Sequence, residues 1–299
     1  MRLLCLILFV VGCFAQNGNS GGLPACQASL DTCNTNLAST TSLLTTCDSD
    51  LGVNSAREAR TALQVDITRG WHYLIRDRAR DIMATQTIPP GFSSPTNLGT
   101  IAPLGVFSDT LGILEYYFGL AFSNAARVNV INFHYIHGSN NLVSYQVEIV
   151  LQLYNGNVTV SKFMHKGTFA FNADNLICGF DVTFLWMPLL DTAETATAHT
   201  NSINNICNGI QAVCIGANQK YDNVSDCSAY LHSIPYGGWG KADQNTVGCR
   251  NIHLALARVD PNTHCPHVAR AGPLNLKCYN KPYLGYFNNQ YLACVDPNY

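Results

Sequence analysis

The stretch that decides the fold is LVSYQVEIVLQLYNGNVTVSKF, residues 142–163, in which apolar and polar side chains alternate. A period of two residues is typical of a strand with one buried face, because successive side chains point to opposite sides of a strand. Asn155-Gly156 divides the stretch, and this pair favours a two-residue turn because both residues tolerate positive φ. The stretch therefore predicts a β-hairpin.

The alternation continues on both sides and predicts four sequential strands, at residues 128–136, 142–153, 158–171 and 176–187. Long strands that follow one another along the chain favour an antiparallel meander. Gly167 and Gly179 lie inside two of these strands, where we expect a bulge or a sharp bend.

Helical periodicity precedes the strands. Apolar residues recur at helical spacing over residues 55–84, which predicts one or two helices with Ser55 at the first N-cap. The segment IPPGFSSP, residues 88–95, predicts a loop, and a further helix is expected at 108–122. Helices followed by an antiparallel sheet predict an α+β domain at residues 55–192, with a curved sheet that wraps over the helices.

This order of elements, with GVFSDTLGILEYYFGLAF at 105–122 and FNADNLICGFDVTFLW at 171–186, resembles the SnoaL-like branch of the nuclear transport factor 2-like superfamily. The resemblance covers about residues 60–190 and implies a cone-shaped fold with an apolar pocket between the concave sheet and the helices. Members of the superfamily bind small molecules, catalyse proton transfer or only mediate association. The resemblance therefore leaves the function open.

Strand alternation selects side chains for such a pocket. His165 lies on the apolar side of its strand and is the candidate catalytic base, with a hydrogen-bonded core histidine as the alternative. Glu148 and Asp181 should point away from the pocket, which leaves the sheet without an inward carboxylate. The residues expected to line the pocket are Tyr135, Tyr145, His165, Phe180, Phe184 and Trp186.

The first 15 residues, MRLLCLILFVVGCFA, have the pattern of a cleavable secretory signal. Their apolar run is shorter than the roughly 20 residues that cross a bilayer, and no later segment is suited to a membrane span. Residues 16–25 form a polar linker. The sequence therefore predicts a secreted, extracellular protein, in an environment where cysteines oxidise.

A heptad pattern follows in residues 26–52. Leucine recurs every seven residues from Leu30 to Leu51, and Cys26, Cys33 and Cys47 share a second seam position with Thr40. The intervening Ser, Thr and Asn residues are poor helix formers, so covalent cross-links would be needed to stabilise a helical stalk. We expect a parallel homo-oligomer with interchain disulfides at these three cysteines. A flexible Ser/Thr-rich stalk, O-glycosylated and with local cysteine pairs, is the alternative.

Residues 193–299 predict a cysteine-rich module. Seven cysteines from Cys207 onward, together with Cys178 in the sheet, give an even number that suits intrachain disulfides. The spacing does not determine the pairing. The eight cysteines are Cys178, Cys207, Cys214, Cys227, Cys249, Cys265, Cys278 and Cys294.

One segment of this module, CRNIHLALARVDPNTHCPH at residues 249–267, has a spacing that suits zinc or copper, with two ligands on a helix and two on a following loop. If the cysteines are oxidised, the imidazoles of His253, His264 and His267 would remain as metal ligands. The alternative is that these histidines have a structural role and bind no metal. The module resembles a cysteine-rich unit of secreted proteins from eukaryotic microbes, often found after a SnoaL-like domain. That resemblance implies no activity.

Charged residues are only 12% of the chain and the formal net charge is −2, which argues against a nucleic-acid partner. The triplets that begin at Asn157 and Asn223 are N-glycosylation acceptors. The chain has no phosphate loop, dinucleotide fingerprint, HExxH or Ser-His-Asp order, so no cofactor is expected.

Two classes of function remain. The favoured one is a glycosylated, disulfide-linked, non-catalytic protein of an extracellular matrix, coat or surface assembly, whose partners are further copies of itself and matrix components. The alternative is a secreted SnoaL-like enzyme or small-ligand carrier that uses the apolar pocket.

Overall fold

The computed structural model describes residues 23–89, 91–92, 98–107, 110–121, 126–154, 158–186, 196–272, 275, 277–282 and 292–295. It divides into two compact units, Met1–Ala59 and Arg60–Tyr299. The secretory signal, most of the linker, the Asn155-Gly156 turn and Asn157 lie outside the described residues, as do the side chains of Cys26, Cys33 and Cys47. No helix in the described ranges combines the length and apolarity that crossing a bilayer requires.

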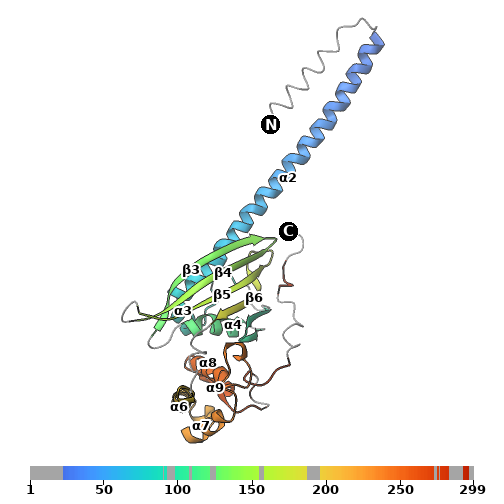
Figure 1. The fold of residues 1–299 in the computed structure, drawn as a ribbon. Coiled ribbons are helices and arrows are strands. Elements are labelled where there is room, and N and C mark those ends of the chain that lie inside the picture. The colour runs from blue at the N-terminus through green and yellow to red at the C-terminus, as the bar shows by residue number, and fades with distance from the viewer. Residues whose placement is uncertain are drawn as a thin grey trace. The chain divides into compact units, whose positions relative to one another are not determined.

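The amino-terminal helix α2 is continuous from Leu23 to Asp77 (Figure 1). The prediction that a helix begins at Ser55 is therefore wrong. The Ser55 hydroxyl donates to the Gly52 carbonyl oxygen at 3.0 Å, a local bond that a helix interior tolerates. The chain leaves the helix only at Arg78, after which α3 spans Ala79–Thr85.

The sheet has six strands: β1 Leu98–Ala102, β2 Gly105–Phe107, β3 Ala126–Ser139, β4 Leu142–Leu153, β5 Thr159–Phe171 and β6 Ile177–Trp186. Their order is β2-β1-β6-β5-β4-β3, and β3 to β6 form the antiparallel meander that the alternation predicts. β1 runs parallel to β6, with Thr100 opposite Asp181, so the sheet is mixed rather than purely antiparallel. β1 and β2 are too short to show a clear alternation in the sequence.

The pairing register shifts at several points, which marks β-bulges. Two shifts lie in β3, between Val128 and Val130 and between Phe133 and Tyr135. A third lies beside Gly179, where a bulge was predicted. Gly167 instead pairs regularly with Val182, and a Cβ atom there would lie 2.7 Å from Val182 Cγ2, so close packing excludes a side chain.

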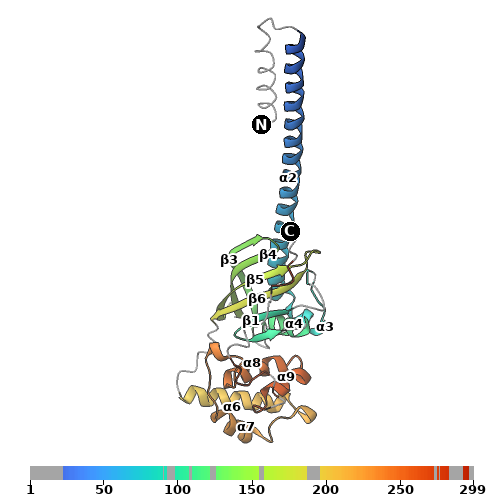
Figure 2. The same ribbon diagram turned by 90° about the vertical axis from the view of Figure 1, so that its right-hand side faces the viewer.

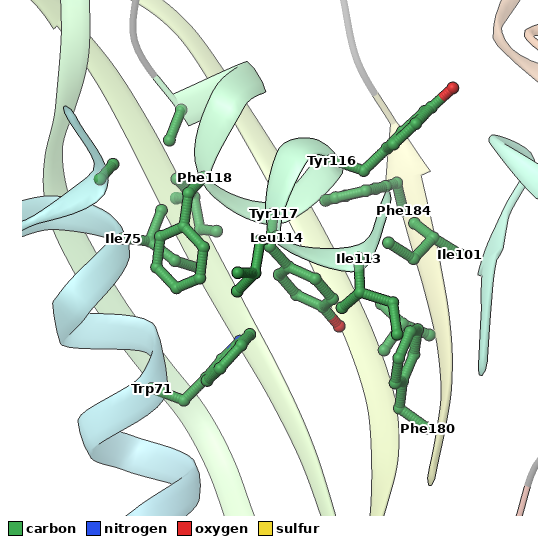
Figure 3. Packing of buried hydrophobic residues seen from close by; sticks show 14 of the residues in the cluster. Trp71, Ile75, Ile101, Ile113, Leu114, Tyr116, Tyr117, Phe118, Phe180 and Phe184 are labelled. Atoms are coloured by element: carbon green, nitrogen blue, oxygen red, sulfur yellow. The ribbon is translucent and has the colours of Figure 1, made fainter. Parts of the chain in front are cut away.

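Helices cover one face of the sheet. The carboxyl-terminal part of α2, α3, α4 (Thr110–Phe118) and the 3-10 turn η1 (Gly119–Ala121) bury their apolar residues against it. The Trp71 ring stacks on Phe92. It meets the rings of Tyr117 and Phe118 edge-on (Figure 3). These contacts confirm the predicted α+β class, in which a curved sheet encloses helices.

The remaining helices form a second core (Figure 2). They are α6 Ala196–Val213, α7 Val224–His232, α8 Val247–Ala257 and α9 Pro261–Val268, with the 3-10 turns η2 Gly216–Asn218 and η3 Trp239–Lys241. The segment expected to be a loop at HCPH is helix α9. Its start is set by Asp260, whose carboxylate accepts from the amides of Asn262 and Thr263, and by Pro261 in the first turn.

All eight cysteines from Cys178 onward form disulfides. The pairs are Cys178–Cys294, Cys207–Cys227, Cys214–Cys265 and Cys249–Cys278. The predicted intrachain set is therefore confirmed, and the structure supplies the pairing that the sequence left open.

Candidate functional site

The concave face of the sheet carries the side chains that alternation assigns to it. Val143, Tyr145 and Val147 of β4 are all fully buried, whereas Asp181 of β6 is exposed. Glu148 accepts a hydrogen bond from Asn132 on the opposite face. The prediction that the sheet carboxylates point away from the interior is confirmed.

A pair of histidines lies inside this face. His165 of β5 is fully buried, and its Nε2 atom lies 3.1 Å from Nε2 of His72 on α2. His72 Nδ1 donates to the Thr68 carbonyl oxygen at 2.7 Å, which leaves His72 Nε2 as the acceptor for His165. The sequence placed His72 on a helix but did not show which way it points.

Burial makes both histidines weak bases. It lowers the pKa of His72 to about 4 and that of His165 well below its usual value, with a smaller effect of His72 on His165. A general base works best with a pKa near the operating pH. The His72–His165 pair is therefore neutral at neutral pH and poorly suited to proton abstraction.

The described part of the cone has a small cavity. This cavity has a volume of about 30 Å³ and is lined by residues that include Tyr117, Phe163, His165 and Phe184. Such a volume holds one or two water molecules, whereas small-molecule sites occupy about 300–1,000 Å³. This cavity is too small for such a ligand, and the larger apolar pocket stays a prediction.

The six residues expected to line the pocket separate into four groups. His165 and Phe184 line the small cavity, and Tyr145 and Phe180 are buried in the core beside it. The Trp186 side chain lies outside the described residues. Tyr135 is 47% exposed, because the bulge after Phe133 places it opposite Gln146 instead of Tyr145; its assignment to the pocket is corrected.

A larger groove of about 740 Å³ lies elsewhere, on the outer side of β1 and β6. Its lining includes the charged residues Asp181, Lys241, Asp243 and Lys281, and Lys281 Nζ lies 3.1 Å from Asp243 Oδ2. Partial burial raises the pKa of Asp181. No sequence pattern indicated this groove, because its residues come from strands and loops that are far apart in the chain.

A second histidine cluster joins α8 and α9. His253, His264 and His267 each offer a ring nitrogen, and these atoms lie within 4.8 Å of one another, as the sequence spacing predicts. The neighbouring Cys249 and Cys265 are in disulfides, so they offer no thiolate.

Helix α4 adds two polar side chains to this cluster that sequence reasoning missed. Glu115 Oε2 lies 2.9 Å from His264 Nε2, and Tyr116 Oη lies 3.1 Å from His253 Nε2. Burial lowers the pKa of His253 well below its usual value, and burial and His264 lower that of His267 to about 3. Burial also raises the pKa of Tyr116, so its hydroxyl keeps its proton.

Comparison with known proteins gives a match over part of the chain. Residues 183–278 match the BfoA family C-terminal domain, which is less than half of the chain. The chain is similar to fungal biosynthesis cluster proteins. Aurasperone B biosynthesis cluster protein A of Aspergillus niger is 37% identical over 119 residues, which cover 34% of this chain and 38% of that protein.

A second relative matches a similar share of this chain. Bifonsecin B biosynthesis cluster protein A of Aspergillus brasiliensis is 34% identical over 117 residues, which cover 34% of this chain and 39% of that protein. The chain thus spans less than two fifths of the length of either relative. Among solved structures, a SnoaL-like family protein from Agrobacterium tumefaciens is 11% identical, with a TM-score of 0.28, and the match covers 42% of this chain and 97% of that one.

Proposed function

We propose that this protein is secreted, glycosylated and non-catalytic, and that disulfides through its amino-terminal helix join its chains into an extracellular matrix, coat or surface assembly. The observation that carries the proposal is the continuity of α2 over Cys26, Cys33 and Cys47. Positions seven and fourteen residues apart on a continuous helix recur on one face. Three cysteines on one face of a helix suit pairing with the same residues of a parallel copy.

The small cavity of the described cone supports a role in association. A carrier or an enzyme of the SnoaL-like kind needs room for a substrate beside its base, and the cavity that the described residues form beside His165 has a volume of only about 30 Å³. The buried side chains there stabilise the domain instead. The alternative of catalysis or ligand carriage through the cone is therefore disfavoured.

The disulfides support export. Four intrachain bridges form and persist in oxidising compartments, whereas cytosolic thiols are kept reduced. An exported chain would also oxidise the cysteines of its amino-terminal helix.

Replacing Cys26, Cys33 and Cys47 together by serine is expected to abolish covalent oligomers. Without reductant, the secreted wild-type chain should migrate at a multiple of the mass of one chain, and the triple variant at the mass of one. Non-reducing electrophoresis and mass spectrometry of the intact protein measure this difference. A wild-type band at the mass of one chain without reductant would rule out the cross-linked assembly and favour local cysteine pairing.

Asn223 is expected to carry an N-linked glycan. The residue is exposed, and its Oδ1 atom caps α7 by accepting from the Asp226 amide, which leaves Nδ2 available for the sugar. The Asn223→Asp variant keeps a capping oxygen and removes the acceptor. Enzymatic deglycosylation should therefore reduce the mass of the secreted wild-type protein by one more glycan than that of the variant. Equal mass losses would contradict the assignment, and Asn157→Gln tests the other triplet separately.

A further inference from the structure

We propose that His253, His264 and His267 bind one divalent transition-metal ion, with zinc favoured, and that Glu115 orients His264 as a ligand. The site does not depend on the proposed assembly. It would lie where α8 and α9 meet α4. The protein would supply only imidazole nitrogens as ligands.

The distances between the ring nitrogens fit a tetrahedral ion. Zinc binds imidazole nitrogen at about 2.0–2.1 Å, so two ligands of a tetrahedral site lie about 3.3 Å apart. Nδ1 of His253 lies 3.2 Å from Nδ1 of His264. The ligand atoms of all three histidines lie within 4.8 Å of one another, and the proposal requires the partly buried His267 ring to move toward the other two.

The neighbours on α4 hold two of the rings as metal sites require. A ligating histidine commonly donates its other N–H to a carboxylate, which fixes the tautomer and the ring orientation. Glu115 Oε2 lies 2.9 Å from His264 Nε2 and accepts that proton, so the lone pair of His264 Nδ1 points toward His253. Tyr116 Oη lies 3.1 Å from His253 Nε2 and holds the second ring from the opposite side.

Two buried polar atoms at the cluster have no hydrogen-bond partner in the part of the chain that the structure describes. They are Nδ1 of His267 and Oε1 of Glu115. Buried polar groups are nearly always paired, so each such atom calls for an explanation. A metal ion on the cluster gives Nδ1 of His267 a partner, and it leaves Oε1 of Glu115 unpaired.

Hydrogen bonding alone explains only part of this arrangement. Without a metal, Tyr116 donates to His253, His253 Nδ1 donates to His264, and His264 donates to Glu115, which satisfies those contacts. That chain leaves Nδ1 of His267 unpaired. Two kinds of charged neighbour act on a cation at the cluster in opposite directions. The Glu115 carboxylate favours its binding, and the ammonium groups of Lys277 and Lys281 disfavour it.

The chemistry of the ligands favours zinc. Cys249 and Cys278 lie beside His253, and their disulfide removes the thiolates that would select copper(I) or an iron–sulfur cluster. Three imidazoles and an open position suit zinc in a tetrahedral site. Copper(II) prefers a tetragonal arrangement, and cobalt(II) is a spectroscopic probe for the tetrahedral one.

The test uses the full secreted chain, purified without nickel affinity or chelator and then dialysed against a chelator. Calorimetric titration with zinc sulfate should give one equivalent per chain, and cobalt(II) should produce the visible absorption of a tetrahedral ion. His267→Gln should lose both signals. Glu115→Gln should weaken zinc binding about 10- to 100-fold.

His232 supplies the matched control, because it is exposed at the end of α7 and outside the cluster. His232→Gln should bind zinc and cobalt like the wild type. Equal binding by wild type and His267→Gln, or no saturable binding by wild type, would leave a hydrogen-bonded network only and overturn the proposal. The cobalt spectrum of the wild type decides the geometry even where a variant fails to fold, since an octahedral spectrum contradicts a three-histidine tetrahedral site.

Discussion

Replacing Cys214 and Cys265 together by alanine is expected to lower the free energy of unfolding by about 4 kcal/mol. The bridge joins α6 to α9 and closes a loop of 51 residues, and opening that loop increases the conformational freedom of the unfolded chain. Both cysteines are buried in the second core, where alanine leaves little empty space. Urea denaturation of the oxidised protein, followed by circular dichroism, measures the change.

The other bridges provide a comparison. The same entropic argument gives about 3 kcal/mol for Cys207–Cys227 and about 5 kcal/mol for Cys178–Cys294, whose loops span 20 and 116 residues. The double-alanine variants should therefore rank in the order of loop length. A larger loss at Cys207–Cys227 than at Cys178–Cys294 would show that local packing, not chain entropy, determines how much each bridge stabilises the protein.

Lowering the pH from 7 to 4 is expected to destabilise the protein strongly. Burial lowers the pKa values of His72, His165, His253 and His267 in the folded chain. The unfolded chain therefore binds more protons than the folded chain once the pH falls below about 6.5, and the free energy of unfolding decreases as the pH falls. For His72 alone, a shift from 6.5 to about 4 corresponds to about 3 kcal/mol.

The measurement uses chelator-treated protein, so that protonation of the histidines is separated from any loss of metal. Unfolding in urea between pH 7 and pH 4 should show a free energy that decreases steadily below pH 6.5. His72→Gln should have a weaker pH dependence, whereas His232→Gln, which changes an exposed side chain, should retain the wild-type slope. The lowered pKa of Asp77 acts in the same direction, but only at the acidic end of the range. A free energy independent of pH over this range would mean that the histidines are solvated.

The regular alternation of apolar and polar residues made it possible to predict which side chains are buried in the centre of the sheet. Near the edge of the sheet, irregular strand pairing made the same prediction fail. Tyr145 and Val147 lie in an undisturbed part of β4, so their burial followed from the sequence. Tyr135 follows a bulge that reverses the faces of β3, and a sequence does not reveal where such an extra residue is inserted. Ser55 has the chemistry of a helix cap, yet the helix that begins far before it continues through it.

The histidine cluster was predictable where its members are close in the chain. His253 and His264 are 11 residues apart, and His253 lies on the helix that the spacing suggested, whereas His264 lies on α9, where a loop was expected. Glu115 is 149 residues from His264, and only the tertiary fold brings them together. One signal was present: Glu115 is the single carboxylate in the otherwise apolar helix α4, TLGILEYYF.

The outer strands of the sheet affect how copies of this protein associate when they are crowded. An unpaired strand invites another chain to extend the ladder, and this is the first step toward amyloid. One margin of this sheet is β2, only three residues long, and the other is β3, whose ladder is interrupted twice. Crowded copies should therefore not extend one another's sheets through backbone hydrogen bonds. Contacts between copies would then depend on their side chains.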